Sequence, residues 1–156
     1  MTPTIRAATV TEDTLIAQHF YQLWLDNGLS PEMICPDWQV ITLSFITQAR
    51  RELGYQAFVA EVAGQVVGSA GGQRFAGCYP IAFTPAFRAD GYIWGVYVEP
   101  EYRQRGLGKQ LTQRVLDHLQ RIGCTRAVLN ASPSGKSVYE RLGFQPSNAM
   151  YLNLPV

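Results

Sequence analysis

The 156-residue sequence has few of the residues that build metal centres and disulfide frameworks. It contains 3 cysteines and 2 histidines, and neither type recurs at the spacing of a metal-binding motif. The odd number of cysteines favours reduced, structural thiols, and we expect no metal. A nucleophilic role for Cys78, which lies in a polar segment, is the alternative.

Excess charge of one sign is also missing, because 13 basic and 12 acidic residues leave a formal net charge of +1. Such a chain has no long-range electrostatic field that would attract nucleic acid or a membrane surface, and we expect neither as a partner. No apolar run approaches the length of a membrane span, and the first residues contain no hydrophobic signal core. These features predict a cytoplasmic protein, and the length predicts a single domain over residues 1–156.

Hydrophobic periodicity predicts a mixed α+β order of elements. Helices are expected over residues 15–24, 38–53, 107–122 and 134–143. Strands are expected at residues 4–9, 55–62, 65–72, 92–98, 125–131 and 150–154. The second and third strands should form a hairpin around Ala63-Gly64.

Residues 74–90 change character, with aromatic side chains among prolines and glycines. The aromatic residues are Phe75, Tyr79, Phe83 and Phe87. A loop of this length in a compact domain is typically functional. The alternative is a surface excursion whose aromatic side chains pack on the sheet, and both readings stay open at this point.

The segment EPEYRQRGLGKQL, residues 99–111, joins a predicted strand to the best-defined helix. The first N–H groups of a helix have no intrahelical partner, and the helix dipole favours an anion there. Gly106 and Gly108 lack a Cβ, so the backbone can approach a ligand closely. The pattern predicts a phosphate or pyrophosphate site, and its alternative is an ordinary helix start with solvated arginines.

Two familiar phosphate motifs do not fit this segment. A dinucleotide fingerprint needs a third glycine where this chain has Leu111. A P-loop needs a glycine at Arg103 and a serine or threonine at Gln110.

The order Arg103-x-x-Gly106-x-Gly108, after VYVEPEY and before VYERLGF, resembles the GNAT superfamily of N-acetyltransferases. The resemblance is strongest from Gly91 to Leu154, and the first half matches only in outline. It implies an α/β (α+β) GNAT fold: a mixed, mostly antiparallel sheet of six to seven strands, flanked by about four helices and splayed at the cofactor strand. It also implies that acetyl-CoA donates its acetyl group to a primary amine of a small molecule or peptide, by direct attack in a ternary complex.

The resemblance assigns cofactor-binding residues by position. Backbone groups of the strand before the loop would hold the pantetheine and the acetyl oxygen, and those residues are Val96, Tyr97 and Val98. The loop and helix start would hold the CoA phosphates, through Arg103, Gln104, Arg105, Gly106, Leu107, Gly108 and Lys109. Further polar contacts would come from Ser132, Ser134 and Lys136, although these residue types are also what an ordinary turn requires.

Tyr139 matches the family tyrosine whose hydroxyl reaches the CoA sulfur and protonates the leaving thiolate. The alternative is a tyrosine that only packs against its helix neighbours. Some family members carry a glutamate base at the position of Tyr92, so the resemblance names no base here. An ordered water, or an amine that arrives neutral, would then serve.

The sequence says least about the acceptor substrate. Trp24 and Trp94 are candidates for an apolar wall of its pocket, and residues 74–90 are expected to border it. The runner-up function is a CoA-binding sensor or structural GNAT member without turnover. The alternating final strand is compatible with a homodimer, an assembly frequent in the family.

Overall fold

A computed structural model describes the chain except for the side chains of residues 79 and 80, so the aromatic ring of Tyr79 lies outside the described part. One five-stranded sheet has the order β1-β2-β3-β4-β5. The strands are β1 (Thr4–Ala7), β2 (Gln56–Val62), β3 (Gln65–Arg74), β4 (Asp90–Val98) and β5 (Arg126–Val128). The first four pair antiparallel, and β5 runs parallel to β4.

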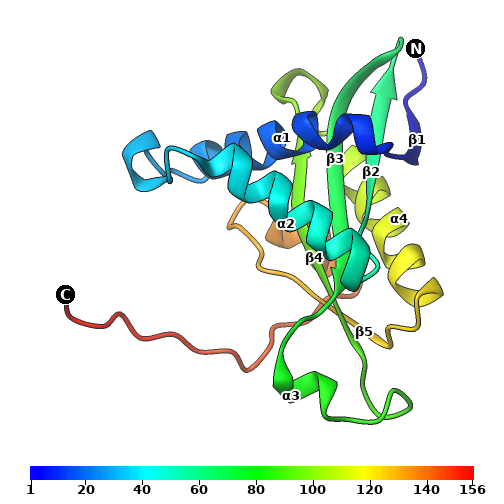
Figure 1. Cartoon of the computed structure of the whole chain (residues 1–156). Coiled ribbons are helices and arrows are strands. Elements are labelled where there is room, and N and C mark those ends of the chain that lie inside the picture. The colour runs from blue at the N-terminus through cyan, green and yellow to red at the C-terminus, as the bar shows by residue number, and fades with distance from the viewer.

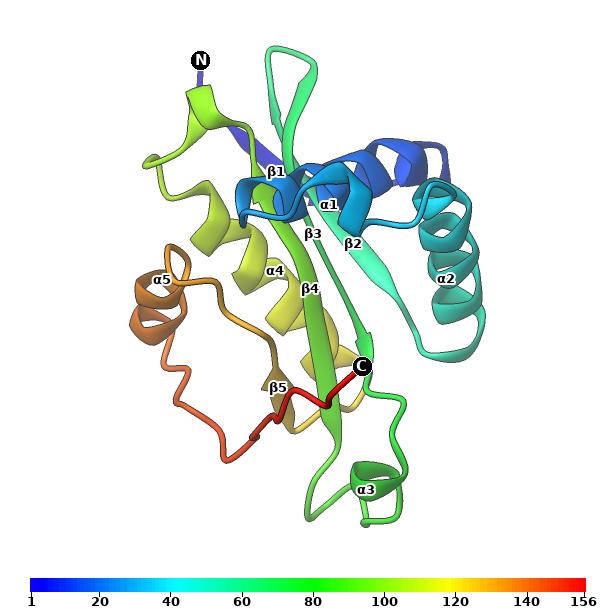
Figure 2. The ribbon, with the colours of Figure 1, turned by 90° about the vertical axis from the view of Figure 1, so that its left-hand side faces the viewer.

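Five α-helices accompany the sheet in the described part of the chain. They are α1 (Asp13–Asp26), α2 (Trp38–Glu52), α3 (Cys78–Ile81), α4 (Leu107–Arg121) and α5 (Lys136–Arg141). Short 3-10 turns occupy Val10–Glu12, Pro31–Met33 and Pro100–Tyr102. Figure 2 shows β4 running between α4 and α5 on one side and α1 on the other.

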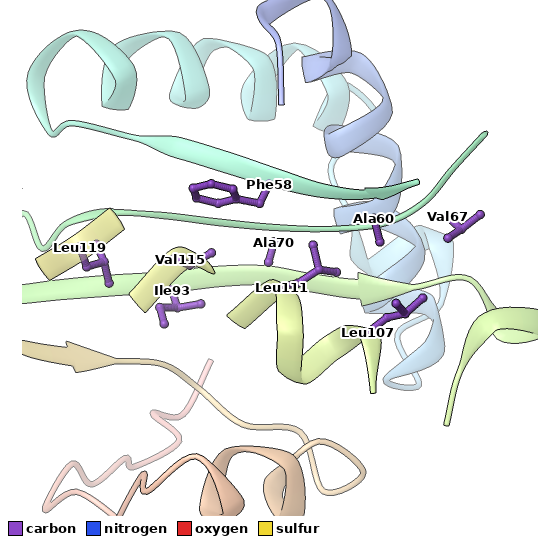
Figure 3. Packing of buried hydrophobic residues seen from close by; sticks show 9 residues of the cluster. All are labelled: Phe58, Ala60, Val67, Ala70, Ile93, Leu107, Leu111, Val115 and Leu119. Atoms are coloured by element: carbon purple, nitrogen blue, oxygen red, sulfur yellow. The ribbon is translucent and has the colours of Figure 1, made fainter. Parts of the chain in front are cut away.

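The two faces of the sheet bury two separate cores. Helix α4 places an apolar residue every four positions against one face, and these side chains are almost fully buried. The cluster is drawn in Figure 3 and consists of Phe58, Ala60, Val67, Ala70, Ile93, Leu107, Leu111, Val115 and Leu119. Each buried leucine or valine contributes about 1.5–3 kcal/mol relative to exposure, so the start of α4 is held firmly. On the opposite face the core is Ile16, Ile46, Ala49, Tyr55, Ala57 and Trp94.

Local turn chemistry behaves as the sequence predicts. Ala63 and Gly64 both have positive φ, 54° and 80°, as a tight hairpin turn requires. A capping box begins the entry to α1, in which the Thr9 N–H donates to Glu12 Oε2 at 2.8 Å. Arg6 lies 2.7 Å from Glu12 and lowers the pKa of that carboxyl to about 2.

The predicted strand count is wrong, because the structure has five strands rather than six to seven. The expected strand at residues 150–154 forms no ladder, and the strand at 125–131 shrinks to Arg126–Val128. An alternating pattern selects which face of a strand is apolar, but a strand also needs an edge to pair with. In Figure 1 the red C-terminal segment leads away from the sheet.

No helix in the described part of the chain is both long enough and apolar enough to cross a membrane.

Candidate active site

A cleft of about 750 Å³ opens where β4 and β5 diverge. The two strands pair only from Asp90 to Tyr92, opposite Arg126 to Val128, so β4 beyond Tyr92 has no paired strand on that side. The C-terminal half of β4, the loop before α4, the end of α1 and the chain from Leu129 to Arg141 form the walls. A cleft of this size lies in the range of small-molecule sites.

A bulge in β4 shapes the floor of this cleft. Opposite Ser69 and Gly71 of β3 stand Tyr97 and Trp94, so two residues of β4 face one residue of β3. One of the two, Gly95, has φ +67°, a conformation that other residues rarely adopt. A bulge leaves its extra residue unpaired in the ladder, so backbone groups at this point are available to a ligand.

The start of α4 forms one end of the cleft. Gly106 is the N-cap of α4 and has φ +77°, and the preceding turn includes Gln104 with φ +61°. A Cβ added at Gly108 would meet no atom within 4 Å, so the space in front of the first helical N–H groups is open. Free N–H groups and the positive end of the helix dipole together make an anion site.

The three basic side chains of the loop are arranged differently. Arg103 turns toward α1: its Nε donates to Val98 O at 2.8 Å and its Nη2 to Asp26 Oδ2 at 2.5 Å. Arg105 donates to Glu101 O at 3.0 Å and stacks on the Tyr102 ring. Among the described residues Lys109 forms no ion pair, and it lines the cleft. Lys109 is therefore the loop cation best placed for a ligand.

Tyr139 lies on the opposite wall of the cleft, on α5. Its ring packs edge-on against Phe144 with centroids 5.8 Å apart, and no described residue bonds its hydroxyl. Burial raises the pKa of Tyr139 above its usual value of 10, so the phenol carries its proton at neutral pH. The turn before α5 is fixed by Gly135 N–H, which donates to Ser132 Oγ at 3.2 Å. The arrangement suits a proton donor.

Aromatic side chains fill the α1 and α2 side of β4. Trp94 is buried, and its Nε1 donates to Gln73 Oε1 at 2.7 Å. The Trp94 ring contacts Phe20 and Phe45 edge-on, at centroid distances of 4.8 Å and 5.7 Å. Trp24 also packs on Phe20, with ring centroids 4.6 Å apart.

Next to this aromatic group, Tyr92 and Asn130 bridge the divergence of the two strands. The Asn130 Nδ2 donates to Tyr92 Oη at 3.2 Å. No carboxylate lies on β4 between Tyr92 and Val98, so this part of the strand offers no acidic base.

Sequence comparison places the chain in a family. Residues 17–144 match the Acetyltransferase (GNAT) family. The chain belongs to this family. Glucosamine 6-phosphate N-acetyltransferase of Trypanosoma brucei brucei is 33% identical over 112 residues, which cover 70% of this chain and 73% of that protein. The chloroplastic GCN5-related N-acetyltransferase 1 of Arabidopsis thaliana is 36% identical over 69 residues, or 42% of this chain and 34% of that protein.

Solved structures show the same fold. A GCN5-related N-acetyltransferase from Ralstonia eutropha superposes with a TM-score of 0.84 at 22% identity, covering 98% of this chain and 99% of that one. A predicted acetyltransferase from Clostridium acetobutylicum, solved with acetyl-CoA, has a TM-score of 0.80 at 22% identity, covering 99% of this chain and 96% of that one. The GNAT fold expected from the sequence, splayed at β4, is confirmed.

The structure brings most of the residues predicted from sequence into one cleft. In its walls lie Trp94, Val96, Tyr97, Val98, Arg103, Gln104, Gly106, Leu107, Gly108, Lys109, Ser132, Ser134 and Tyr139. Three predicted residues lie outside its walls: Arg105, Trp24 and Lys136. Lys136 is 3.8 Å from Glu140 of its own helix. Their roles remain predictions.

Sequence reasoning missed two features of the GNAT cleft. Gly95 carries the bulge, and a glycine inside a strand pattern is the signal that indicates one. Asp26 holds Arg103 across 77 positions of sequence, and no local pattern indicates a contact of that range.

Proposed function

We propose that the protein is an acetyl-CoA-dependent N-acetyltransferase that moves an acetyl group to a primary amine of a small molecule or peptide. Transfer occurs by direct attack within a ternary complex. The observation that carries the proposal is the convergence on one cleft of a bulged strand, a free helix N-terminus and a protonated phenol. Membership of the acetyltransferase family supports the same activity.

The end of the cleft at the start of α4 suits the phosphate groups of CoA. The open space at Gly108 allows a pyrophosphate to approach the first N–H groups of α4, where any larger side chain would stand in its way. Lys109 adds a positive charge on the first turn of that helix. The pantetheine amides would pair with the free edge of β4 at Val96 to Val98, and with Ser132 and Ser134 opposite.

When bound, acetyl-CoA supplies an activated acyl carbonyl and a thiolate as leaving group. The backbone at the β4 bulge would orient and polarise that carbonyl, because its N–H groups are not used by a neighbouring strand. Tyr139 would donate its hydroxyl proton as the C–S bond breaks, which yields CoA as a thiol. The protein thus lowers the barrier mainly by positioning both substrates.

Deprotonation of the amine is the step for which the cleft shows no unpaired acidic residue, because Asp26, the one carboxylate among its described lining residues, accepts a hydrogen bond from Arg103. Tyr92 occupies the strand position nearest the divergence, and its hydroxyl is held by Asn130. Two routes fit this arrangement: an ordered water that accepts the proton, or an amine that arrives neutral. A bell-shaped rate profile with an acidic limb set by the acceptor's own pKa would support the second route.

The first acceptor to test is glucosamine 6-phosphate, because a relative 33% identical over 70% of this chain is named for it. Glucosamine without the phosphate is the matched comparison. The experiment measures thiol release from acetyl-CoA with these acceptors and a panel of primary amines, together with the mass of the product.

Sustained thiol release that requires an amine, with a product heavier by one acetyl group, is the expected result. The alternative function is a CoA-binding sensor without turnover, which the missing strand carboxylate favours. A protein that binds CoA tightly and releases no thiol with any amine would establish that alternative.

A further inference from the structure

The stretch between Arg6 and Arg50, which forms α1, the loop after it and most of α2, carries charge of one sign. It contains five carboxylate side chains and no lysine or arginine. Its one histidine, His19, is buried, and burial lowers the pKa of that ring to about 4, so it is neutral at physiological pH. A ligand that lies against this stretch therefore meets carboxylates and no cation that belongs to it.

Arginines from outside the stretch neutralise only part of this charge. Arg6, Arg50 and Arg103 each form an ion pair with one of its carboxylates, at 2.5–2.7 Å. The other two carboxylates, Glu32 and Asp37, form no ion pair among the described residues. They lie in the loop between α1 and α2 and at the start of α2. The side of the molecule built by these helices therefore stays negative after pairing.

Aromatic rings connect this negative side to the cleft. Trp94, in the cleft wall, contacts Phe45 of α2 edge-on with ring centroids 5.7 Å apart, and Phe45 is 42% exposed. Tyr92 lies two positions before Trp94 on the same face of β4 and packs edge-on against Phe75, which is 37% exposed, with centroids 6.2 Å apart. We call these four rings the aromatic rim. Partly exposed rings grouped beside a cleft typically mark a binding surface.

A phosphorylated acceptor would find no cation on this side of the cleft. Three basic residues line the cleft: Arg103, Lys109 and Arg141. Arg103 is held by α1, and Lys109 stands at the start of α4, where we place the CoA phosphates. Arg141 belongs to α5, which lies on the other side of β4 from α1 (Figure 2). Arg88, the one basic residue of the segment 75–89, forms an ion pair with Asp90.

We propose that the acceptor is a cationic primary amine that carries an aromatic ring, and that its ring lies on the aromatic rim. The inference rests on the proposed acetyl transfer and names the acceptor class for it. An ammonium group complements both the carboxylate surplus and the faces of the rings, whereas the phosphate of a sugar phosphate is repelled. The acceptor's ring would cover the partly exposed rings of Phe45 and Phe75.

The reaction balances for such an acceptor. Its ammonium loses two protons in all as the N–C bond of the amide forms and the C–S bond of acetyl-CoA breaks. One of them replaces the proton that Tyr139 gives to the leaving thiolate, and the other passes to water. The products are an N-acetyl amide and CoA as a thiol.

The experiment compares kcat/KM for thiol release from saturating acetyl-CoA with two pairs of acceptors. Phenethylamine and ethylamine differ by the ring, and glucosamine and glucosamine 6-phosphate differ by the anion. We expect kcat/KM to be at least about tenfold higher for phenethylamine than for ethylamine, and lower for glucosamine 6-phosphate than for glucosamine. Equal values for phenethylamine and ethylamine, or glucosamine 6-phosphate as the best acceptor, would overturn the inference and leave the proposed acetyl transfer standing.

Two variants of α2 test the aromatic rim itself. Phe45→Ala removes a ring that contacts Trp94, and the matched control Val40→Ala trims an exposed side chain on a different side of the same helix. We expect kcat/KM for phenethylamine to fall at least about fivefold in Phe45→Ala, with ethylamine within about twofold and no change in Val40→Ala. Phe45→Leu keeps an apolar side chain of similar size and should change the same ratio if Phe45→Ala is unstable. An unchanged ratio of the two amines in a folded Phe45 variant would overturn the inference.

Binding measured without turnover separates this inference from the proposed function. Phenethylamine and ethylamine are titrated in turn into the protein with CoA present, and the tryptophan fluorescence gives a dissociation constant for each. If no amine releases thiol, the proposed acetyl transfer is wrong. Saturable binding of phenethylamine that is weaker in Phe45→Ala would then still support the aromatic-amine site, and the absence of saturable binding would overturn it as well.

Discussion

The two sides of β4 are built on different physical principles. On the side where we propose acetyl-CoA, the groups offered to a ligand are largely backbone: the bulge at Gly95 and the free N–H groups at the start of α4. On the side where we propose the acceptor, the strand is covered by aromatic side chains, with the buried Trp94 packed among Phe20 and Phe45. A backbone site depends on a few glycines and a helix start, whereas a surface made of side chains changes with any one of many residues. We therefore expect the first side to be specific for one common ligand and the second to differ with the acceptor.

The largest effect is expected from Tyr139→Phe, which removes one oxygen and keeps the ring against Phe144. We expect turnover to fall by about 10- to 1,000-fold, the range for loss of a positioned acid, with little change in KM for acetyl-CoA. The melting temperature should stay the same, because no described residue bonds the hydroxyl. Turnover and melting are measured on one preparation.

Tyr21→Phe is the control for that variant, since Tyr21 stacks on Trp38 outside the cleft. Full turnover of Tyr139→Phe with a lowered melting temperature would show Tyr139 to be a packing residue.

The next largest effect tests the backbone side through its two glycines. Gly108→Val keeps an ordinary helical conformation but fills the open space in front of the N–H groups, so KM for acetyl-CoA should rise at least about tenfold with the fold intact. Gly106→Ala should lower the melting temperature as well, because Gly106 has φ +77°. Initial rates and thermal melts of both variants separate ligand approach from backbone strain. An unchanged KM for acetyl-CoA in folded Gly108→Val would show that the CoA phosphates do not bind at this helix start.

A smaller effect, on KM for the acceptor rather than for acetyl-CoA, is expected on the side of β4 where we propose the acceptor. Trp94→Phe retains an aromatic ring and leaves the buried amide of Gln73 without its indole donor. We expect KM for the acceptor to rise while KM for acetyl-CoA stays within about twofold, and stability to fall by about 1–3 kcal/mol. Kinetics with each substrate varied in turn measure both constants. Equal changes in KM for the acceptor and KM for acetyl-CoA would show that the two sides of β4 do not bind different substrates.

The last effect concerns stability alone, without an expected change in either KM, and involves His19, which contacts both strands beside the bulge. Its Nδ1 shares a 2.8 Å hydrogen bond with Ser69 Oγ, and its ring lies 5.0 Å from that of Tyr97. Burial lowers the pKa of His19 from 6.5 to about 4. Between these values the unfolded chain binds a proton that the folded chain does not, so stability falls as the pH drops from 6.5 to 4.

The loss assigned to His19 is about 3 kcal/mol over that range. His19→Asn keeps a hydrogen-bonding group near Ser69 and should abolish this part of the pH dependence in urea unfolding. Glu12, with its pKa lowered to about 2 from 4.5, should act at lower pH and remain in the variant. An unchanged slope between pH 6.5 and 4 would show that His19 does not titrate as assigned.

The sequence predicts the parts of this molecule that are local. Helix α4 and the hairpin at Ala63-Gly64 follow from a periodic pattern and a turn type, and the loop that joins β4 to α4 follows from a contiguous motif. The direction of Arg103 did not follow, because Asp26 lies 77 positions away. The prediction of a strand at residues 150–154 was wrong for the same reason. The alternating pattern is present, but a strand forms only where the edge of another strand lies beside it, and the structure places no such edge there.

The proposed CoA site is tested most directly by titrating the protein with CoA and following the backbone amides by nitrogen–proton NMR. We expect the largest shifts on the amides of Val96 to Val98 and of Arg103 to Lys109, while those of α2 stay in place. Shifts concentrated on α2 or on the N-terminal half, with the start of α4 unaffected, would contradict it.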